Sequence, residues 1–262
     1  MRRYEAKTRY KISKAQLELL LLILKFRFVS SDILAECLGK DRSTIYERLS
    51  VLVDQEYVIK KYDKTYRFRQ RPVIYYLAPA GIRLLMREGF PRARIHYKNK
   101  DFTDELIDEQ LLLGHLSRTI ASHYSGKFKL LTKYEANSDD FYLTPPPFAK
   151  LVGISDSIPD YFIEYFPPYY ESWKMRKRIN QHLDYANDHD DYIYPNLLMI
   201  CGNDSTLKRT VRMTADTYSD FDMFCTTKDQ VLSGVTGIWL KPEEVDWDKE
   251  HECHPISLRP DN

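Results

Sequence analysis

The segment SSDILAECLGKDRSTIYERLSVLVDQEYVIK, residues 30–60, contains two successive patterns of apolar residues with the period of a helix. In the first pattern Ser31 is the expected N-cap, and Gly39, which is free to adopt positive φ, is the expected end. The second pattern opens at Asp41 or Ser43. The inward positions are Ile33, Leu34 and Leu38 in the first pattern, and Ile45, Leu49, Leu52 and Val53 in the second. The segment therefore predicts two helices in direct succession.

The sequence on both sides of this segment extends the predicted fold. Upstream, Ser13 can cap a helix whose apolar face includes Leu17, Leu20, Leu21 and Leu24. Downstream, residues 57–62 (YVIKKY) and 72–77 (PVIYYL) are rich in β-branched and aromatic residues, and they predict a hairpin with a cationic tip, KTYRFRQR, at residues 64–71. A further helix is predicted from Pro79 to Gly89. Helices followed by such a hairpin make a winged helix-turn-helix, and residues 30–60 resemble that superfamily along their whole length.

A winged helix-turn-helix predicts binding to double-stranded DNA. Side chains at the start of the third helix would reach base edges in the major groove, while the wing would contact the phosphate backbone or the minor groove. The candidate residues are Arg42, Ser43, Thr44, Tyr46 and Arg48 in the helix, and Lys60, Lys61, Lys64, Arg67, Arg69 and Arg71 in the wing. Two other interpretations remain open: a solvated helix face, or a surface that docks a protein. Tyr66 and Phe68 would either pack in the hairpin or stack on nucleotides.

The distribution of charge supports a division of the chain into two domains. The 262 residues carry a net charge of +1, but residues 1–100 contain 23 Lys+Arg and 10 Asp+Glu, giving +13, whereas the rest contains 16 and 28, giving −12. The basic part suits a polyanion. We place the boundary between residues 1–95 and 96–262, with residues 91–100 as a basic linker. The apolar runs are too short to cross a membrane, the four cysteines form no CxxC pair, and a cytoplasmic protein without a signal peptide is expected.

The acidic part predicts an α/β domain with a mixed sheet, which gives the whole chain an α+β class. A long helix is expected from Thr103 to Tyr124. After it, helix and strand patterns alternate. The expected strands are FKLLTKYE, PDYFIEYF, YYES, NLLMICG, DFDMFCTT and GIWL, and the expected helices cover residues 174–187 and 205–218.

The order of these segments resembles the replication-relaxation family, which is linked to plasmid replication and mobilisation. The resemblance lies in a winged helix followed by LLGHLSRTIA, then IPDYFIEYF-YYES-KMRKRINQHLDYA and NLLMICGND-TLKRTVRMT. It implies a second domain similar to the PD-(D/E)xK nuclease fold. Positions that match the family's pattern are His115 in the long helix, Pro159 and Asp160 before a strand, Glu171 on the next strand, and Tyr185 at the end of the following helix.

The catalytic pattern of such a nuclease is incomplete in this sequence. An active site of this kind needs an Asp and a Glu to hold Mg²⁺ and a Lys to orient water. With Glu171 in the motif, Trp173 occupies the lysine position; with Glu164 instead, Phe166 does. The sequence therefore favours a non-catalytic platform for a protein partner or a second subunit, with no cofactor. The alternative is an active Mg²⁺-dependent endonuclease that uses Asp160, Glu171 and a displaced Lys174 or Lys177.

Overall fold

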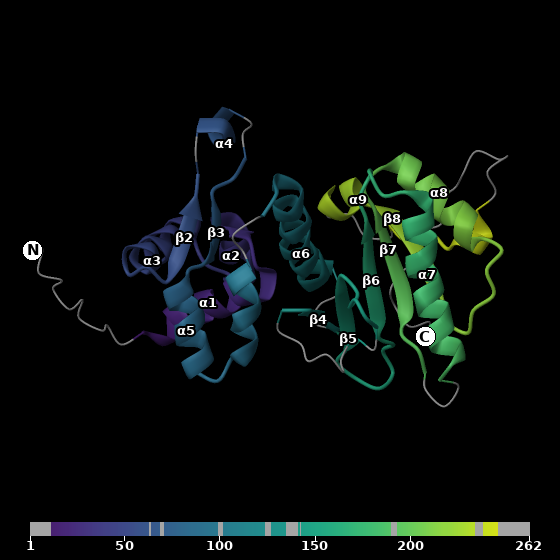
Figure 1. Cartoon of the computed structure of the whole chain (residues 1–262), viewed down its shortest axis with the longest axis horizontal. Coiled ribbons are helices and arrows are strands. Elements are labelled where there is room, and N and C mark those ends of the chain that lie inside the picture. Colours follow the sequence, from purple (N-terminus) through teal and green to yellow (C-terminus); the bar gives the residue numbers. More distant parts are fainter. Residues whose placement is uncertain are drawn as a thin grey trace, which may run out of the picture. The chain divides into compact units, whose positions relative to one another are not determined.

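The computed structural model divides the chain into two units, Met1–Phe102 and Thr103–Asn262 (Figure 1). It describes residues 12–62, 64–68, 71–98, 102–123, 127–134, 141, 143–189, 193–233 and 238–245. The sequence places the boundary at 95/96, whereas the structure assigns residues up to Phe102 to the first unit. No helix in the described ranges is both long enough and apolar enough to span a bilayer.

Unit 1 combines helices with a small antiparallel sheet. The helices are α1 (Lys14–Phe26), α2 (Ser31–Leu38), α3 (Arg42–Asp54) and α5 (Pro79–Arg87). The sheet has the order β1-β3-β2, formed by β1 (Val29–Ser30), β3 (Ile74–Leu77) and β2 (Val58–Lys61). Val58 pairs with Leu77 and Lys61 with Ile74, so β2 and β3 form the predicted antiparallel pair.

Local capping explains where the helices of unit 1 begin and end. Ser13 and Gln16 form a reciprocal capping box at the start of α1, as the Ser13 prediction required. Gly39 ends α2 in the left-handed conformation with φ of 58°, which confirms that prediction. The prediction of Ser31 as the N-cap of α2 was wrong by one residue. The Ser30 hydroxyl accepts the hydrogen bond from the amide of Ile33, at 3.3 Å. The third helix begins at Arg42 after Asp41.

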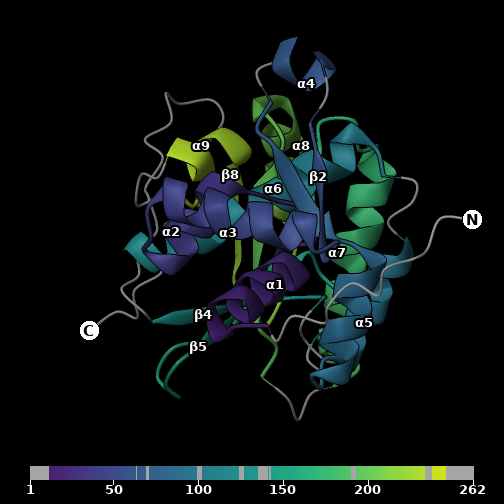
Figure 2. The same ribbon diagram turned by 90° about the vertical axis from the view of Figure 1, so that its left-hand side faces the viewer.

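The tip of the hairpin differs from a simple loop. Residues 64–68 form a short helix, α4 (Lys64–Phe68), at the far end of β2 and β3 (Figure 1, Figure 2).

The prediction of a linker at residues 91–100 is wrong in its first part, because η1 (Pro91–Lys98) is a 3₁₀ helix that packs against α5. It buries Ala93 and His96. Burial is the main cause that lowers the pKa of His96 to about 4.

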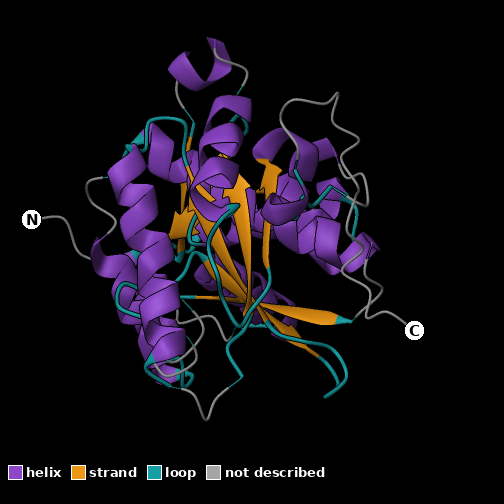
Figure 3. Cartoon of the chain, turned by 90° about the vertical axis from the view of Figure 1, so that its right-hand side faces the viewer, coloured by secondary structure: helices purple, strands orange, loops and turns teal. Residues whose placement is uncertain are grey.

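Unit 2 is built on a five-stranded sheet, and the sheet is mixed, as the sequence predicts. Its order is β4-β5-β6-β7-β8, with β4, β5 and β6 antiparallel and β6, β7 and β8 parallel. The strands are β4 (Phe128–Thr132), β5 (Ala149–Gly153), β6 (Tyr161–Phe166), β7 (Asn196–Cys201) and β8 (Met223–Thr227). They fan out with the usual twist of an open sheet (Figure 3). The strand β5 was not predicted.

Helices cover both faces of this sheet. They are α6 (Asp104–His123), α7 (Ser172–Asn187), α8 (Asp204–Thr214) and α9 (Lys228–Ser233), with a 3₁₀ turn η3 (Pro242–Glu244). Apolar residues of α7 and α8 share one buried cluster with Phe162, Phe166 and Met199 of the strands. The helix α6 lies on the opposite side of the strands (Figure 1). Residues 169–172, expected as a strand, instead lead into α7. In the expected strand GIWL, Leu240 forms an isolated bridge to Cys225.

Candidate functional site

The exposed face of α3 is rich in hydrogen-bonding groups rather than in positive charge. Arg42 and Ser43 are exposed, Tyr46 has 48% of its surface exposed, and Thr44 and Arg48 are half-buried. The same face carries Glu47, Ser50 and Val51. Arg42 makes an ion pair of 2.8 Å with Asp32 of α2. The exposed groups of α3 are therefore suited to directional hydrogen bonds more than to attraction by net charge.

A contact between Tyr46 and Lys60 joins α3 to the hairpin strand β2. The Lys60 ammonium lies 3.5 Å from the Tyr46 hydroxyl, to which it donates, and 5.4 Å from the centre of the Tyr46 ring. Both side chains are exposed. The polar face of α3 and the cationic strand β2 consequently form one continuous surface, which the sequence alone did not connect.

The two aromatic residues at the tip of the hairpin have different environments, and the burial of Tyr66 favours packing over stacking for this residue. Tyr66 is 3% exposed, whereas Phe68 is 90% exposed. The Tyr66 ring lies 5.1 Å from the ammonium of Lys61 and 5.9 Å from the guanidinium of Arg71. Lys61 also lies 4.6 Å from the ring of Phe102. Tyr66 therefore packs inside the tip.

The other basic residues of the hairpin lie at its surface where they are described. Lys60, Lys64 and Arg67 are exposed, and Lys61 and Arg71 are half-buried over aromatic rings. Arg69 lies outside the described residues. The described cations of the hairpin thus divide into those that pack on the Tyr66 ring and those that project into solvent.

In unit 2, both carboxylate oxygens of Asp160 contact groups of the neighbouring strand β5. One of its carboxylate oxygens lies 2.9 Å from the ammonium of Lys150 on β5, whose side chain is buried. The other oxygen accepts a hydrogen bond of 3.0 Å from the amide of Gly153. Asp160 therefore fixes the start of β6 against β5.

The structure does not bring Asp160 and Glu171 together. Asp160 precedes β6, and Glu171 follows the far end of that strand as the N-cap residue of α7, not on a strand as expected. Six residues of extended chain span about 20 Å. The helix α7 then runs back along β6, because Arg178 and His182 contact Glu164. Glu171 instead pairs at 3.0 Å with Lys174 and accepts from Trp173 at 2.8 Å, and all three are exposed.

Glu164 forms several buried polar contacts in unit 2. In the sequence it is only the alternative to Glu171 for the glutamate of the nuclease motif. Glu164 lies buried in the middle of β6, and one carboxylate oxygen accepts from Arg178 Nε at 2.8 Å and lies 2.7 Å from Nη2. His182 Nε2 is 2.9 Å from the same oxygen, and its Nδ1 is 2.8 Å from the Tyr194 hydroxyl. Arg178 also donates to the carbonyl of Pro145 and to Gln181. We call Glu164, Arg178, His182 and Tyr194 the buried network.

The protonation states in the buried network follow from its contacts. Burial alone raises the pKa of Glu164, but the hydrogen bond from His182 and the charge of Arg178 outweigh it and hold this pKa below its ordinary value. Burial lowers the pKa of His182. We therefore assign a neutral imidazole with its proton on Nε2, donating to Glu164, while Nδ1 accepts from Tyr194.

This assignment predicts that acid destabilises unit 2. A histidine kept neutral in the fold takes up its proton more readily when unfolded, and a carboxylate with a lowered pKa loses stabilisation as it is protonated. Both effects are absent at neutral pH and grow as pH falls through the ordinary histidine value of 6.5 and then the ordinary glutamate value of 4.5. Urea unfolding at a series of pH values measures them through tryptophan fluorescence, because residues 173, 239 and 247 are the three tryptophans and all belong to unit 2.

A matched variant isolates the histidine contribution to this prediction. In His182→Gln the fall in unfolding free energy between pH 7 and pH 5.5 should be smaller than in the wild type, even if the variant is less stable throughout. A wild-type stability that is flat or rises over this range would contradict the assignment.

Other residues singled out by the sequence have more ordinary surroundings. Tyr185 stacks on His189 with ring centres 4.1 Å apart, and His189 also contacts the Tyr185 carbonyl. His115 is half-buried in α6. Within the described ranges no group of three or more His, Cys, Asp or Glu side chains is arranged to hold a metal ion.

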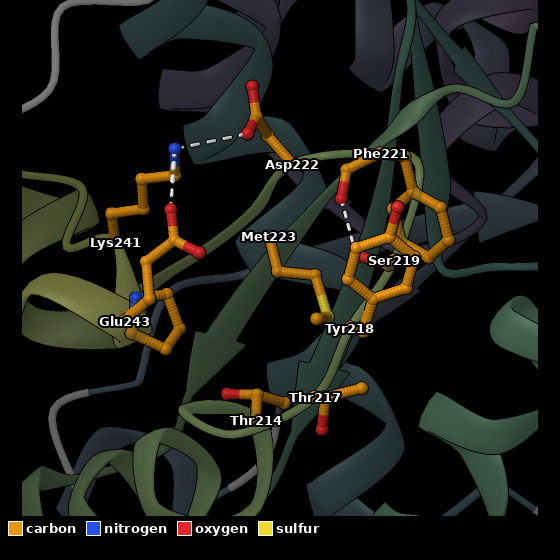
Figure 4. Close-up of a pocket in the computed structure, with 10 residues that line it drawn as sticks. Thr214, Thr217, Tyr218, Ser219, Phe221, Asp222, Met223, Lys241 and Glu243 are labelled. Atoms are coloured by element: carbon orange, nitrogen blue, oxygen red, sulfur yellow. Dashed lines mark hydrogen bonds and ion pairs between the residues drawn. The ribbon is translucent and has the colours of Figure 1, made fainter.

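A pocket of about 170 Å³ lies beside the start of β8, between the end of α8 and η3 (Figure 4). Lys241 at its rim forms ion pairs with Asp222 at 3.2 Å and Glu243 at 2.7 Å, and its pKa is raised, first by Glu243. The hydroxyls of Thr214, Thr217 and Ser219 donate to backbone carbonyls. Because these polar groups already have partners inside the protein, the pocket presents no evident ligand chemistry.

Comparison of the chain with protein-family models, with curated proteins and with solved structures finds no match.

Proposed function

We propose that this chain is a double-stranded-DNA-binding protein whose first unit acts as a winged helix-turn-helix. In this proposal α3 is the recognition helix, and β2, α4 and β3 form the wing. The observation that carries it is the continuous surface of unit 1, on which the polar face of α3 is joined through Tyr46 and Lys60 to a basic hairpin. The charge of +13 over residues 1–100 supports the same partner.

The two parts of this surface would have different roles. The face of α3 contains hydroxyl groups and also Glu47, so its value is in hydrogen bonds to base edges. The wing supplies the positive charge, with six basic residues and one acidic residue between Lys60 and Arg71. This arrangement is what a sequence-specific binder needs, because phosphate contacts set affinity while base contacts set specificity.

We propose unit 2 as a non-catalytic, nuclease-like platform of replication-relaxation type, serving plasmid replication, mobilisation or transcriptional regulation. Asp160 pairs with Lys150, Glu164 with Arg178, and Glu171 with Lys174, so each carboxylate of the possible catalytic patterns has a basic partner. A protein partner or a second subunit would dock on this unit. Tyr169 and Trp173, each about 60% exposed, are residue types that dominate protein interfaces.

The ion pair between Arg42 and Asp32 provides a test with a built-in control. Arg42→Ala should weaken binding about five- to tenfold to duplexes selected from a random pool, because one charged contact is lost. Asp32→Ala breaks the same ion pair but keeps the cation and removes an acidic group, so affinity should stay the same or rise. Fluorescence anisotropy with the full chain measures both.

The two variants separate a direct contact from a structural effect. The ion pair is exposed at both ends and contributes little to stability, so neither change should shift the melting temperature appreciably. Equal losses of affinity in both variants would mean that Arg42 acts only by holding α2 against α3. If the wild-type chain selects no duplex from the random pool, the proposed function itself is wrong.

A further inference from the structure

Phe68 is unlike every other large apolar residue of unit 1 whose exposure is described. It is 90% exposed, whereas Tyr46, Val51, Tyr62, Ile95 and Tyr97 lie between 40% and 48%. Unlike a tyrosine, its side chain has no polar atom to interact with water. It occupies the last position of α4, at the outermost part of the hairpin (Figure 1, Figure 2).

The packing of the tip forces this exposure. Tyr66 is buried, and its carbonyl accepts a hydrogen bond of 2.9 Å from the amide of Arg71, which closes the tip onto the strands. Residues two positions apart in a helix point to different sides. With Tyr66 turned inward, Phe68 is presented outward on a short, anchored helix.

The charge around Phe68 indicates what covers it. The exposed Lys64 and Arg67 share its helix, and Arg69 follows it in the sequence. An apolar side chain surrounded by cations fits a surface that is negative at its edges and apolar in its interior. The minor groove of DNA meets this description when two base pairs separate, since phosphates flank the groove and the apolar faces of the bases are reached between neighbouring pairs.

We propose that Phe68 is a wedge that inserts between base pairs from the minor groove and kinks the duplex. The proposal rests on the DNA-binding function proposed above. Lys64 and Arg67 would hold the wing on the flanking phosphates, and Phe68 would enter the stack between them. Proteins that insert apolar wedges in this way bend DNA by about 20–90° toward the major groove.

The experiment measures bending separately from binding. Energy transfer between dyes at the two ends of a duplex, selected from a random pool by the wild-type chain, reports the bend in the complex. Phe68→Ser should abolish most of the bend and weaken binding about five- to tenfold, with the salt dependence of binding unchanged. Phe68→Leu should keep most of the bend, because leucine is also an apolar wedge. Tyr62→Ser, which removes an exposed aromatic residue near the tip, should leave the bend unchanged.

The outcomes distinguish this inference from the proposed function. A bend in the Phe68→Ser complex equal to that of the wild type, or a straight duplex in the wild-type complex, would overturn the wedge while DNA binding stands. A change in oligomeric state of Phe68→Ser by light scattering, with an unchanged bend, would show that Phe68 packs on a second copy and would also overturn it. A wild-type chain that binds no duplex would overturn both proposals. Because the Phe68 side chain is 90% exposed, the variants are expected to fold normally.

Discussion

Arg178→Met should lower the free energy of unfolding of unit 2 by about 3–5 kcal/mol, the cost typical of removing one partner from a buried ion pair. The side chains of Arg178 and Glu164 are 11% and 9% exposed, and the variant leaves the Glu164 carboxylate buried with His182 as its remaining partner in the network. It also removes the donor to the Pro145 carbonyl. Chemical denaturation followed by tryptophan fluorescence measures the loss.

The neighbouring Arg176 provides the matched control. It lies on the same helix but is exposed, so Arg176→Met removes the same charge and should cost less than about 1 kcal/mol. The double variant Glu164→Gln, Arg178→Met should cost clearly less than the sum of its two single variants, because the residues share one interaction. If Arg178→Met is as mild as Arg176→Met, the buried network is not what stabilises unit 2.

The contacts of the buried network could not be predicted from the sequence. Glu164 lies 14 residues from Arg178 and 18 from His182, and only the packing of α7 on β6 brings these side chains within hydrogen-bonding distance. No periodicity in the sequence encodes that contact. A strand at Glu164 and a helix at Arg178 were both predicted from the sequence. The contact between their side chains was not.

The ends of helices could be predicted from the sequence where they depend on the residue at the cap itself. Ser13 and Gly39 sit where a cap and a left-handed residue are needed, and both predictions were confirmed. The buried face of α1 was predicted less well, because the run LELLLLIL is apolar on nearly all sides. Leu19 and Ile23 are buried, whereas Leu17 and Leu21 are only half-buried. A run in which Glu18 is the one polar residue gives little indication of which side of the helix faces the core.

The errors at the edges of elements have a common origin in tertiary contacts. The segment around Glu171 has the aromatic content of a strand, but its residues form a turn and the start of α7. The strand β5 was missed because AKLVG is short and follows a proline-rich segment, yet it pairs with both β4 and β6. The tip helix α4 depends on the burial of Tyr66, which the alternation of aromatic and basic residues could not show.

The double variant Lys64→Ala, Arg67→Ala should reduce the affinity for duplex DNA by about one order of magnitude or more at 0.15 M salt. Each cation that neutralises a phosphate releases about 0.9 counterion, so the slope of log K against log salt should become shallower by about two units. Both side chains are exposed on α4. Stability should therefore stay unchanged while affinity falls for every duplex sequence alike.

The charge-matched control for this experiment lies in unit 2. Arg176 and Lys177 are exposed and adjacent on α7, and their replacement by alanine changes the net charge of the chain by the same amount. If the wing is the phosphate-binding element, this control should leave the salt slope unchanged. Equal effects of the two double variants would mean that DNA responds only to the total charge of the chain. A shallower slope confined to the wing variant would instead locate the phosphate contacts on α4 and leave specificity to the face of α3.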